Sequence, residues 1–308
     1  MNKQIVLWYA FFVFSLVCAP ILPGIINKVK AFFAGRKGPS VFQLYYDLAK
    51  LVKKEGVTSA SSGFPFPFAP YISLVCLILA ALLLPYGLLP APLSFTGDIV
   101  LFFYLMGTAR MAVALGALDT GSSFEGMGSS RELQFSTLAE CAIFAIIAFL
   151  VILTGRSDLN LLVYTHPVGG DHTVSVILIA ISLFIVLLME NCRVPADDPE
   201  THLELTMIHE AMVLDYAGPD LAAILYGASL KLWLFASFLA CLVLPGHMLL
   251  GWVGVVLFLL LILVVTVLVG LVESCMARYR FLKVPQMLAG ALAIALLGFF
   301  FLKYFEGA

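Results

Sequence analysis

Long apolar runs dominate this sequence and leave few folds open to it. A helix that crosses a bilayer needs about 20 mostly apolar residues, and eight stretches meet that requirement. They are too long and too evenly apolar for membrane β-strands, which alternate over short segments. We therefore predict an all-α polytopic membrane protein with eight transmembrane helices plus amphipathic surface helices, forming a single transmembrane domain over residues 1–308. The predicted spans are 5–27, 69–89, 98–118, 134–154, 173–190, 219–244, 250–273 and 286–305.

The composition excludes several classes of protein. Charged residues make up only 12% of the chain, and the net charge of −2 leaves no basic face for nucleic acid. The six cysteines stand singly, without the CxxC spacing of iron–sulfur or zinc sites, so we expect no metal and no cofactor bound by this chain alone. A glycine-rich phosphate loop and a nucleophile elbow are also missing, and we assign no catalytic residue.

Basic residues gather on alternate loops. The connections after the first, third, fifth and seventh spans hold twelve lysines and arginines, against three in the other connections and the termini. Positively charged loops stay in the cytoplasm, so we expect both termini to lie outside it. The twelve are Lys28, Lys30, Arg36, Lys37, Lys50, Lys53, Lys54, Arg131, Arg193, Arg278, Arg280 and Lys283.

The first of these loops, residues 28–66, contains a predicted amphipathic helix. Arg36 and Lys37 lie on a tight Gly-Arg-Lys-Gly-Pro bend, and Ser40 after it can cap a helix. Apolar residues then recur at helical spacing over 41–54, which is typical of a helix lying on the membrane surface. This helix is either a plain interfacial anchor, the lip of a lateral opening, or a docking surface.

The loop over residues 191–218 is unusually acidic. Together with Glu190 it holds seven carboxylates, one arginine and two histidines, between spans of membrane length. Asp198 is a good helix cap and Pro199 suits the first helical position, so a helix is predicted from there. Glu200 and Glu204 would then lie one turn apart, where like charges repel. The alternatives are a polar cavity and a solvated acidic loop.

Five ionisable residues within or at the ends of the spans are candidates for function, because charges at that depth are costly. Glu140 either pairs with Arg110 or Lys231 or carries a proton. Arg110 stays charged and must be paired, with Asp119 as one candidate partner. Glu190 and Glu273 end their spans and are either interfacial residues or part of the same site.

Taken together, several motifs resemble the complex I subunit 1 family, in which the peripheral redox arm meets the membrane arm. They are Gly35-Arg-Lys-Gly-Pro39 with Gln43 and Asp47, Asp119-Thr-Gly-Ser, Gly128-Ser-Ser-Arg131-Glu132, Glu140, Arg193-Val-Pro-Ala-Asp197, Pro199-Glu200, Glu204-Leu205, Asp215-Tyr216-Ala-Gly218 and Ala277-Arg278. Ala196 replaces the aromatic residue usual in quinone-reducing members, and Thr206–Met212 also departs from them. The resemblance is greatest to the formate hydrogenlyase and hydrogenase-4 branch of group 4 NiFe hydrogenases.

The resemblance implies a non-redox membrane subunit of an oxidoreductase complex in the cell inner membrane. Expected partners are hydrogenase-like large and small subunits, iron–sulfur subunits of a peripheral arm, and antiporter-like membrane subunits. The NiFe centre and the Fe-S clusters would lie in those partners, and a quinone could bind. Residues expected to couple ions are Glu140, Glu190, Glu200, Glu204, Lys231, Arg110, Asp119 and Glu273. Residues expected to dock the arm or line a quinone-like cavity are Arg36, Lys37, Asp47, Arg131, Arg193, Asp197, Asp215, Tyr216 and Arg278.

The favoured hypothesis is a subunit of a formate hydrogenlyase-like complex that couples electron transfer to proton or sodium translocation. The alternatives are the quinone-binding subunit of NADH:quinone oxidoreductase, a passive membrane anchor, and a stand-alone transporter.

Overall fold

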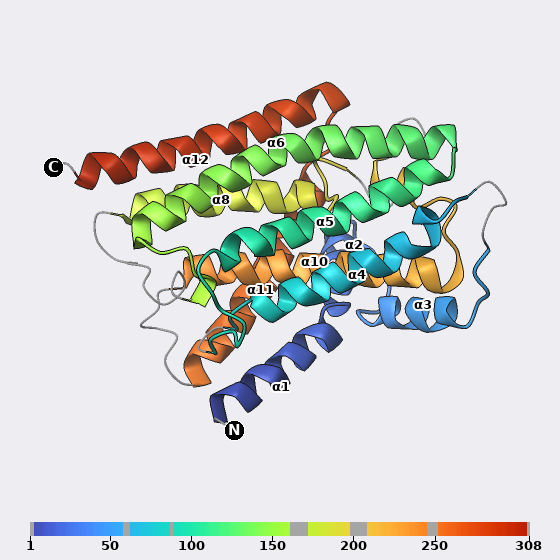
Figure 1. The fold of residues 1–308 in the computed structure, drawn as a ribbon, viewed down its shortest axis with the longest axis horizontal. Coiled ribbons are helices and arrows are strands. Elements are labelled where there is room, and N and C mark those ends of the chain that lie inside the picture. The colour runs from blue at the N-terminus through green and yellow to red at the C-terminus, as the bar shows by residue number, and fades with distance from the viewer. Residues whose placement is uncertain are drawn as a thin grey trace.

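The computed structural model describes residues 3–57, 62–86, 89–160, 172–197, 208–244 and 252–306, and this part of the chain is helical throughout its regular structure (Figure 1). Within these described residues, seven helices are long and apolar enough to cross a membrane, and there are up to eight spans if a bent pair near the N-terminus is one span. The predicted all-α polytopic membrane fold is confirmed. The helices are α1 (Lys3–Cys18), α2 (Ile21–Phe33), α3 (Gln43–Val52), α4 (Pro65–Leu83), α5 (Asp98–Asp119), α6 (Ser123–Thr154), α8 (Thr173–Glu190), α9 (His209–Met212), α10 (Gly218–Val243), α11 (Trp252–Cys275), η2 (Phe281–Lys283) and α12 (Val284–Glu306).

The first predicted span contains Pro20 and Pro23, which predict a kink, and the structure breaks the span beside Pro20. Helices α1 and α2 meet at 46°, and Pro20 stands at the N-cap of α2. A break in a membrane helix frees backbone carbonyls that need donors. Tyr226 of α10 donates to the carbonyl of Leu16 at 2.8 Å, and Tyr45 of α3 donates to the carbonyl of Val17. The break is therefore fixed to both the surface helix and a transmembrane helix.

Helix α3 confirms the amphipathic helix of the first loop, with a different start. It begins at Gln43, and its N-cap position is Phe42, which makes no side-chain capping bond. The predicted cap, Ser40, contributes through its backbone instead, since its carbonyl accepts the N–H of Gln43 at 3.1 Å. The side chain of Gln43 donates to Asp47 at 3.0 Å, one turn further along.

Helix α6 is longer than the apolar pattern predicts. It starts at Ser123 rather than near residue 134 and runs for 32 residues, which is about 48 Å at 1.5 Å per residue. Its first turns carry Glu125 and Glu132, which the hydropathy pattern places in a loop. Both side chains are buried against the rest of the protein, and this tertiary contact extends the helix beyond its apolar part.

Helix α10 forms the centre of the domain. Of its most apolar window, 83% of residues are buried, against 28% for the last span, which lies at the edge of the bundle. It packs against α2, α3, α4, α8 and α11. Figure 1 shows α10 running through the middle of the bundle, with α4 and α5 beside it and α12 at the outer edge. Polar side chains in the middle of α10, such as those of Ser229 and Ser237, are therefore held inside the protein.

Gly218 joins the acidic loop to α10 in a conformation that favours glycine. Its φ is +56°, and a Cβ there would lie 2.8 Å from the carbonyl oxygen of Glu55. We expect Gly218→Ala to destabilise the fold by more than the 1–2 kcal/mol of the left-handed backbone alone, because the contact adds to it. Thermal unfolding of the purified protein measures this loss.

The matched control is Gly126→Ala in α6, where a Cβ meets nothing within 4 Å. Alanine is a better helix former than glycine by about 1 kcal/mol, so this variant should unfold at the same or a higher temperature. Equal losses from the two variants would contradict the interpretation of Gly218.

Candidate functional site

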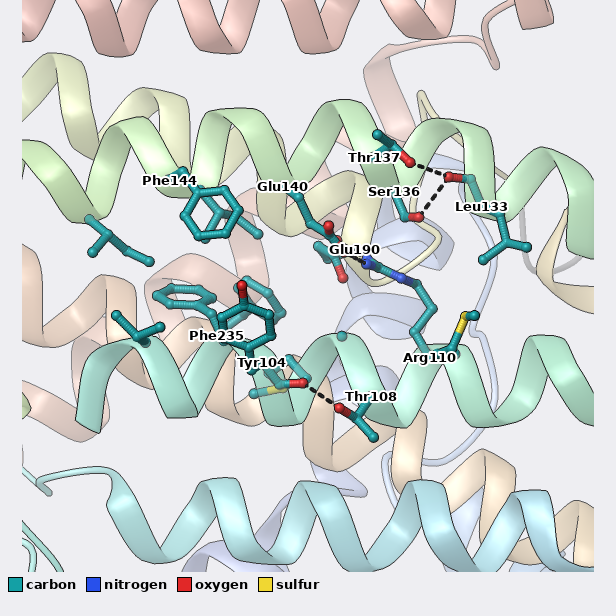
Figure 2. A pocket seen from close by; sticks show the side chains of 17 residues that line it. Tyr104, Thr108, Arg110, Leu133, Ser136, Thr137, Glu140, Phe144, Glu190 and Phe235 are labelled. Carbon is teal, nitrogen blue, oxygen red and sulfur yellow. Dashed lines mark hydrogen bonds and ion pairs between the residues drawn. The ribbon is translucent and has the colours of Figure 1, made fainter. Parts of the chain in front are cut away.

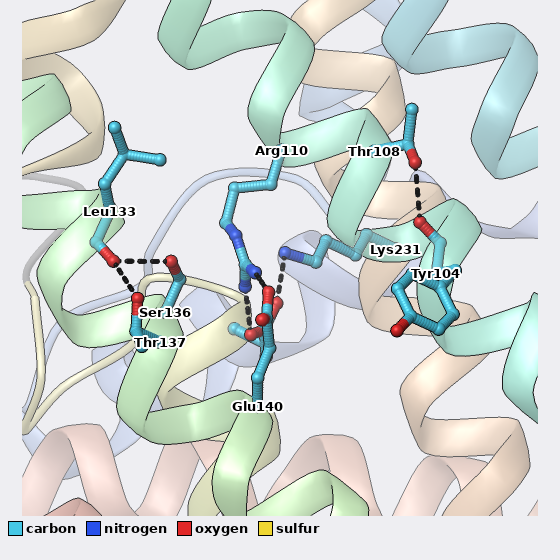
Figure 3. Close-up of polar contacts among 9 residues, drawn as sticks. Tyr104, Thr108, Arg110, Leu133, Ser136, Thr137, Glu140 and Lys231 are labelled. Atoms are coloured by element: carbon cyan, nitrogen blue, oxygen red, sulfur yellow. Dashed lines mark hydrogen bonds and ion pairs between the residues drawn. The ribbon is translucent and has the colours of Figure 1, made fainter.

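Four charged side chains from four helices form one cluster inside the bundle. Arg110 of α5 contacts Glu140 of α6 at 2.6 Å and also donates to Glu190 at the end of α8. Lys231 of α10 lies 2.8 Å from the other carboxylate oxygen of Glu190. Figure 3 shows Arg110 and Lys231 converging on the carboxylates from two sides. We call these four residues the ion-pair cluster. Of the alternatives for Glu140, the structure shows the pair with Arg110, and Lys231 is paired with Glu190.

Burial within the ion-pair cluster is uneven. The exposed fraction of the side chain is 2% for Glu190, 8% for Arg110, 12% for Lys231 and 49% for Glu140. Glu190 is thus the buried anion shared by both cations, whereas Glu140 lies on the side of the bundle. The nearby hydroxyls of Ser136 and Thr137 each donate to the Leu133 carbonyl at 2.9 Å, so they do not serve Glu140.

The ion-pair cluster separates two cavities. A lateral groove of about 390 Å³ lies between α5 and α6 and is lined by Arg110, Glu140 and Glu190 among mostly apolar side chains (Figure 2). A smaller cavity of about 180 Å³, which we call the interior cavity because residues of α4, α5, α8 and α10 line it, includes Arg110, Glu190 and Lys231 together with Glu132 and His209. Arg110 and Glu190 line both spaces. A change in their pairing would therefore change the charge that faces both cavities.

A second group of charges surrounds Glu273 at the end of α11. Its fully buried carboxylate lies 3.3 Å from Lys30 of α2 and 3.4 Å from Arg193. Of the two alternatives for Glu273, these ion pairs favour a place in a charged site, because Lys30 of α2 and Arg193 of the loop after α8 both contact its carboxylate. Arg193 follows Glu190 by three residues and also lines the interior cavity. Arg193 therefore connects the two groups of charges, because it is paired with Glu273 and lines the same cavity as Glu190.

Asp197 holds the acidic loop together. Its carboxylate lies 2.6 Å from Arg278 and accepts the backbone N–H groups of Ile208 and His209 at 3.2 and 3.0 Å. Arg131 and Arg278 both lie over the ring of Phe281, with the guanidinium carbons 4.5 and 5.7 Å from its centre. Asp197 is itself only 1% exposed. These contacts join the loop after α8 to α9 and to the segment before α12.

Asp119, which was one candidate partner for Arg110, lies outside the ion-pair cluster. The two residues are nine positions apart on α5, which is about 13 Å along the helix. Asp119 instead accepts the N–H groups of Gly63 and Phe66 at 2.6 and 3.2 Å at the start of α4. Its observed contacts are structural.

Tyr216 supports the same corner of the molecule. Its hydroxyl donates to the Phe66 carbonyl at 3.0 Å, and the two rings stack with centroids 4.2 Å apart. Burial raises the pKa of Tyr216 above its usual value, so the phenol stays a neutral donor. The backbone N–H of Asp215 donates to Glu125 at 3.1 Å.

Other predicted residues lie at the surface or outside the described part. Arg36 and Lys37 are exposed, and the Lys37 carbonyl accepts a hydrogen bond from the ammonium of Lys28 at 2.9 Å. Glu200 and Glu204, with the helix predicted from Asp198, lie outside the described residues. The acidic loop is described at residues 191–197 and 208–218 only.

Sequence reasoning missed two buried carboxylates, Glu125 and Glu132. Their residues are 0% and 2% exposed, and each has one carboxylate oxygen without a hydrogen-bond partner among the described residues. A signal was present. Glu125, Glu132 and Glu140 follow one another at intervals of seven and eight residues, which places them along one side of a helix. The interpretation of residues 123–133 as a loop hid that spacing.

Comparison with known proteins decides the family. The profile described as NADH dehydrogenase matches residues 5–303, nearly the whole chain. The chain belongs to the NADH dehydrogenase subunit 1 family. Hydrogenase-4 component C of Escherichia coli (strain K12) is 29% identical over 295 residues, covering 94% of this chain and 93% of the relative. Formate hydrogenlyase subunit 4 of the same strain is 30% identical over 290 residues, covering 91% and 93%. This family member is thus a multi-pass membrane protein of the complex I, hydrogenase-4 and formate hydrogenlyase group.

One further sequence relative and one solved structure are also similar to this chain. A subunit of the NADH-quinone oxidoreductase of Rhodobacter capsulatus is 28% identical over 240 residues, covering 71% of this chain and 66% of that protein. A chain in the structure of the membrane-bound sulfane sulfur reductase, an archaeal respiratory membrane complex, superposes with a TM-score of 0.82. That chain is 18% identical, with coverage of 96% of this chain and 98% of its own. The arrangement of helices is shared at this low identity.

The uneven burial of the ion-pair cluster gives a stability prediction. Glu190→Gln leaves two buried cations without their shared anion, and removal of one partner of a buried pair costs about 3–5 kcal/mol. Glu140→Gln should cost less, because Arg110 keeps its ion pair with Glu190 and Lys231 is not paired with Glu140. Thermal unfolding of the two purified variants tests this order. Equal destabilisation would show that Glu190 is not the shared anion.

Proposed function

We propose that this chain is the membrane subunit of a group 4 NiFe hydrogenase-type complex similar to formate hydrogenlyase. In this role it docks the peripheral redox arm and couples electron transfer to proton or sodium translocation. Two relatives named as components of hydrogenase-4 and formate hydrogenlyase support this branch, since both match over 93% of their own length. The chain holds no redox centre in this proposal, and the NiFe centre and Fe-S clusters belong to partner subunits.

The observation that carries the proposal is the position of the ion-pair cluster between two cavities. A structural ion pair alone would need no cavity beside it. Here Arg110 and Glu190 line both the interior cavity and the lateral groove, and Glu140 faces the groove. Ionisable groups inside a membrane domain mark ion pathways when they face such spaces. The cluster is therefore suited to pass a proton or a change of charge from one space to the other.

Coulomb's law gives the size of the effect that a redox event would have on this cluster. A unit charge that arrives about 10 Å away changes a protonation equilibrium by about 1.7 kcal/mol at an effective dielectric constant of about 20. That is more than a tenfold change in the ratio of the protonated to the ionised form. An electron on a docked iron–sulfur subunit could thus shift the protonation of the ion-pair cluster, although this chain binds no redox group.

The lateral groove suggests where a membrane partner lies. Glu140 is half-exposed there, beside the exposed apolar side chains of Tyr104 and Phe144. A carboxylate facing lipid is costly, so a neighbouring subunit would cover this side. We assign that neighbour to the antiporter-like subunits of the complex, with the groove as the route by which the change of charge reaches them.

A different surface, at one end of the bundle, would dock the redox arm. Helix α3 and the turn between α5 and α6 lie at one end of the bundle, away from the C-terminus (Figure 1). We propose that this end is cytoplasmic, with both termini on the other side of the cell inner membrane, because the basic loops follow the odd-numbered spans. The exposed Arg36 and Lys37 would then contact the arm directly, as docking residues.

A quinone-binding role is the second candidate, favoured by the similarity to the NADH-quinone oxidoreductase protein of Rhodobacter capsulatus. Two observations weigh against it. The interior cavity measures about 180 Å³ as bounded by the described residues, below the roughly 300–1,000 Å³ typical of ligand pockets. Ala196, at the position of the aromatic residue in quinone-reducing members, is buried among apolar side chains and does not line this cavity.

The test uses the assembled complex in sealed vesicles, with redox turnover and ion uptake measured together. We expect Glu140→Gln to retain turnover by the redox arm while ion translocation falls to the level of leak, because the cluster loses the carboxylate that faces the groove. Glu55→Gln, which changes an exposed carboxylate of the first loop, is the matched control and should change neither rate.

Each alternative predicts a different result. If ion uptake per electron is unchanged in Glu140→Gln, the chain is a passive anchor and the coupling role is wrong. If the complex instead reduces ubiquinone or menaquinone, and Arg36→Ala or Asp197→Asn abolishes that activity while assembly persists, the quinone-binding role replaces it.

A further inference from the structure

Glu132 is a buried carboxylate that the ion-pair cluster leaves without a cation of its own. It lies on α6 two turns before Glu140, and its residue is 2% exposed. Its Oε2 atom is shielded from solvent and has no hydrogen-bond partner among the described residues. The side chain lines the interior cavity together with Arg110, Glu190 and Lys231. An unsatisfied oxygen of this kind is unfavourable unless it carries a proton or binds a water molecule.

The charge balance of the cluster indicates which form Glu132 takes. Arg110 and Lys231 supply two positive charges, and both are already paired with the carboxylates of Glu140 and Glu190. An ionised Glu132 would be a third negative charge beside two matched pairs. A protonated Glu132 leaves the cluster neutral and turns the unpaired oxygen into a possible donor.

Other charged groups also face the cavity, and the balance must include them. Arg193 lines it from the loop after α8, but its guanidinium is shared with Glu273 at 3.4 Å. His209 and Glu210 line it from α9, and both residues are partly exposed. Among the described residues, the remaining titratable group in the lining is the thiol of Cys192, whose pKa is raised well above its usual value by burial, so that it stays neutral.

The interior cavity has room for water. Its volume of about 180 Å³ exceeds the roughly 10–15 Å³ of probe space that one water molecule needs. Its lining includes the ammonium of Lys231, the imidazole of His209 and the carboxylates of Glu132 and Glu190, so each water molecule would find several polar partners. A polar, roomy cavity of this kind can hold the short water chain that proton transfer requires.

We propose that Glu132 is a proton-binding site of the interior cavity, which exchanges its proton with Glu190 through water in that cavity. In the step, the O–H bond of Glu132 breaks, cavity water carries the proton, and an O–H bond forms on Glu190. One negative charge thereby moves from Glu190 to Glu132, where Lys231 and Arg110 face it across the same cavity. Because Glu190 also lines the lateral groove, the proton then has access to the side of Glu140.

This inference rests on the proposed coupling function and identifies Glu132 as the residue that supplies the proton to the ion-pair cluster. It gives the cluster two opposite carboxylates, Glu132 on the interior cavity and Glu140 on the lateral groove, with Arg110 and Glu190 between them. A purely structural Glu132 would contribute to packing in both redox states alike. A proton-binding Glu132 must change its protonation when the state of the arm changes.

Infrared difference spectroscopy of the assembled complex, oxidised against reduced, tests that change directly. Protonated carboxylic acids absorb in a region separate from carboxylates and amides, and we expect a redox-dependent band there. Glu132→Gln should remove this band and reduce ion translocation to the level of leak in sealed vesicles, while the redox arm still turns over. Glu132→Asp, which keeps a titratable carboxyl, should shift the band and preserve part of the translocation.

Glu125→Gln is the matched control, since Glu125 is equally buried on α6 and also has one unpartnered oxygen among the described residues, but lines neither cavity. Its amide keeps an oxygen that can accept the N–H of Asp215, so the redox-dependent band and translocation should both remain. The proposal is overturned if the band is unchanged in Glu132→Asp, or if Glu132→Gln translocates ions normally. If either outcome is found while Glu140→Gln still abolishes translocation, the coupling function stands and only the role of Glu132 is wrong.

Discussion

The structure depends on one buried carboxylate that serves two cations from two other helices. The carboxylate of Glu190 forms ion pairs with Arg110 from α5 and Lys231 from α10, and its side chain is almost fully buried. Without it, the central helix α10 would carry an unpaired ammonium into the core, and α5 an unpaired guanidinium, each at a large desolvation penalty. The pairing therefore sets how α5, α8 and α10 can pack. The same carboxylate also lies between two cavities, so packing and proposed function depend on a single group.

Local sequence patterns were sufficient to predict much of this fold. The apolar spans, the bend at Pro20 and the amphipathic helix α3 follow from residues close together in the chain, because hydropathy and helical periodicity are local signals. The pairing of Glu140 with Arg110 was also predictable, since few charges occur within the spans and buried ones need partners. The number of candidate partners was small enough for chemistry alone to propose the pair.

The contacts that were not predicted all depend on segments far apart in the sequence. The burial of Glu273 requires α2 to pack against α11, and the contact of Asp119 with Gly63 requires the first loop to return to α5. Neither approach leaves a local pattern. Glu132 was missed for another reason, since α6 continues through polar residues whose carboxylates are covered by other elements. A hydropathy window predicts the end of a helix at the first polar residues, even where contacts with other elements bury those residues and the helix continues.

The length of α6 has a mechanical consequence. The hydrocarbon core of a bilayer is about 30 Å thick, whereas α6 is about 48 Å long, so this helix extends beyond the hydrocarbon core. Near one end it holds the loop before α10 through Glu125, and in its middle it presents Glu140 to the lateral groove. A continuous helix behaves as a stiff rod over this distance. Pressure applied by a docked protein on the protruding turns would displace Glu132 and Glu140 together, and a binding event at the surface would reach the groove as movement as well as charge.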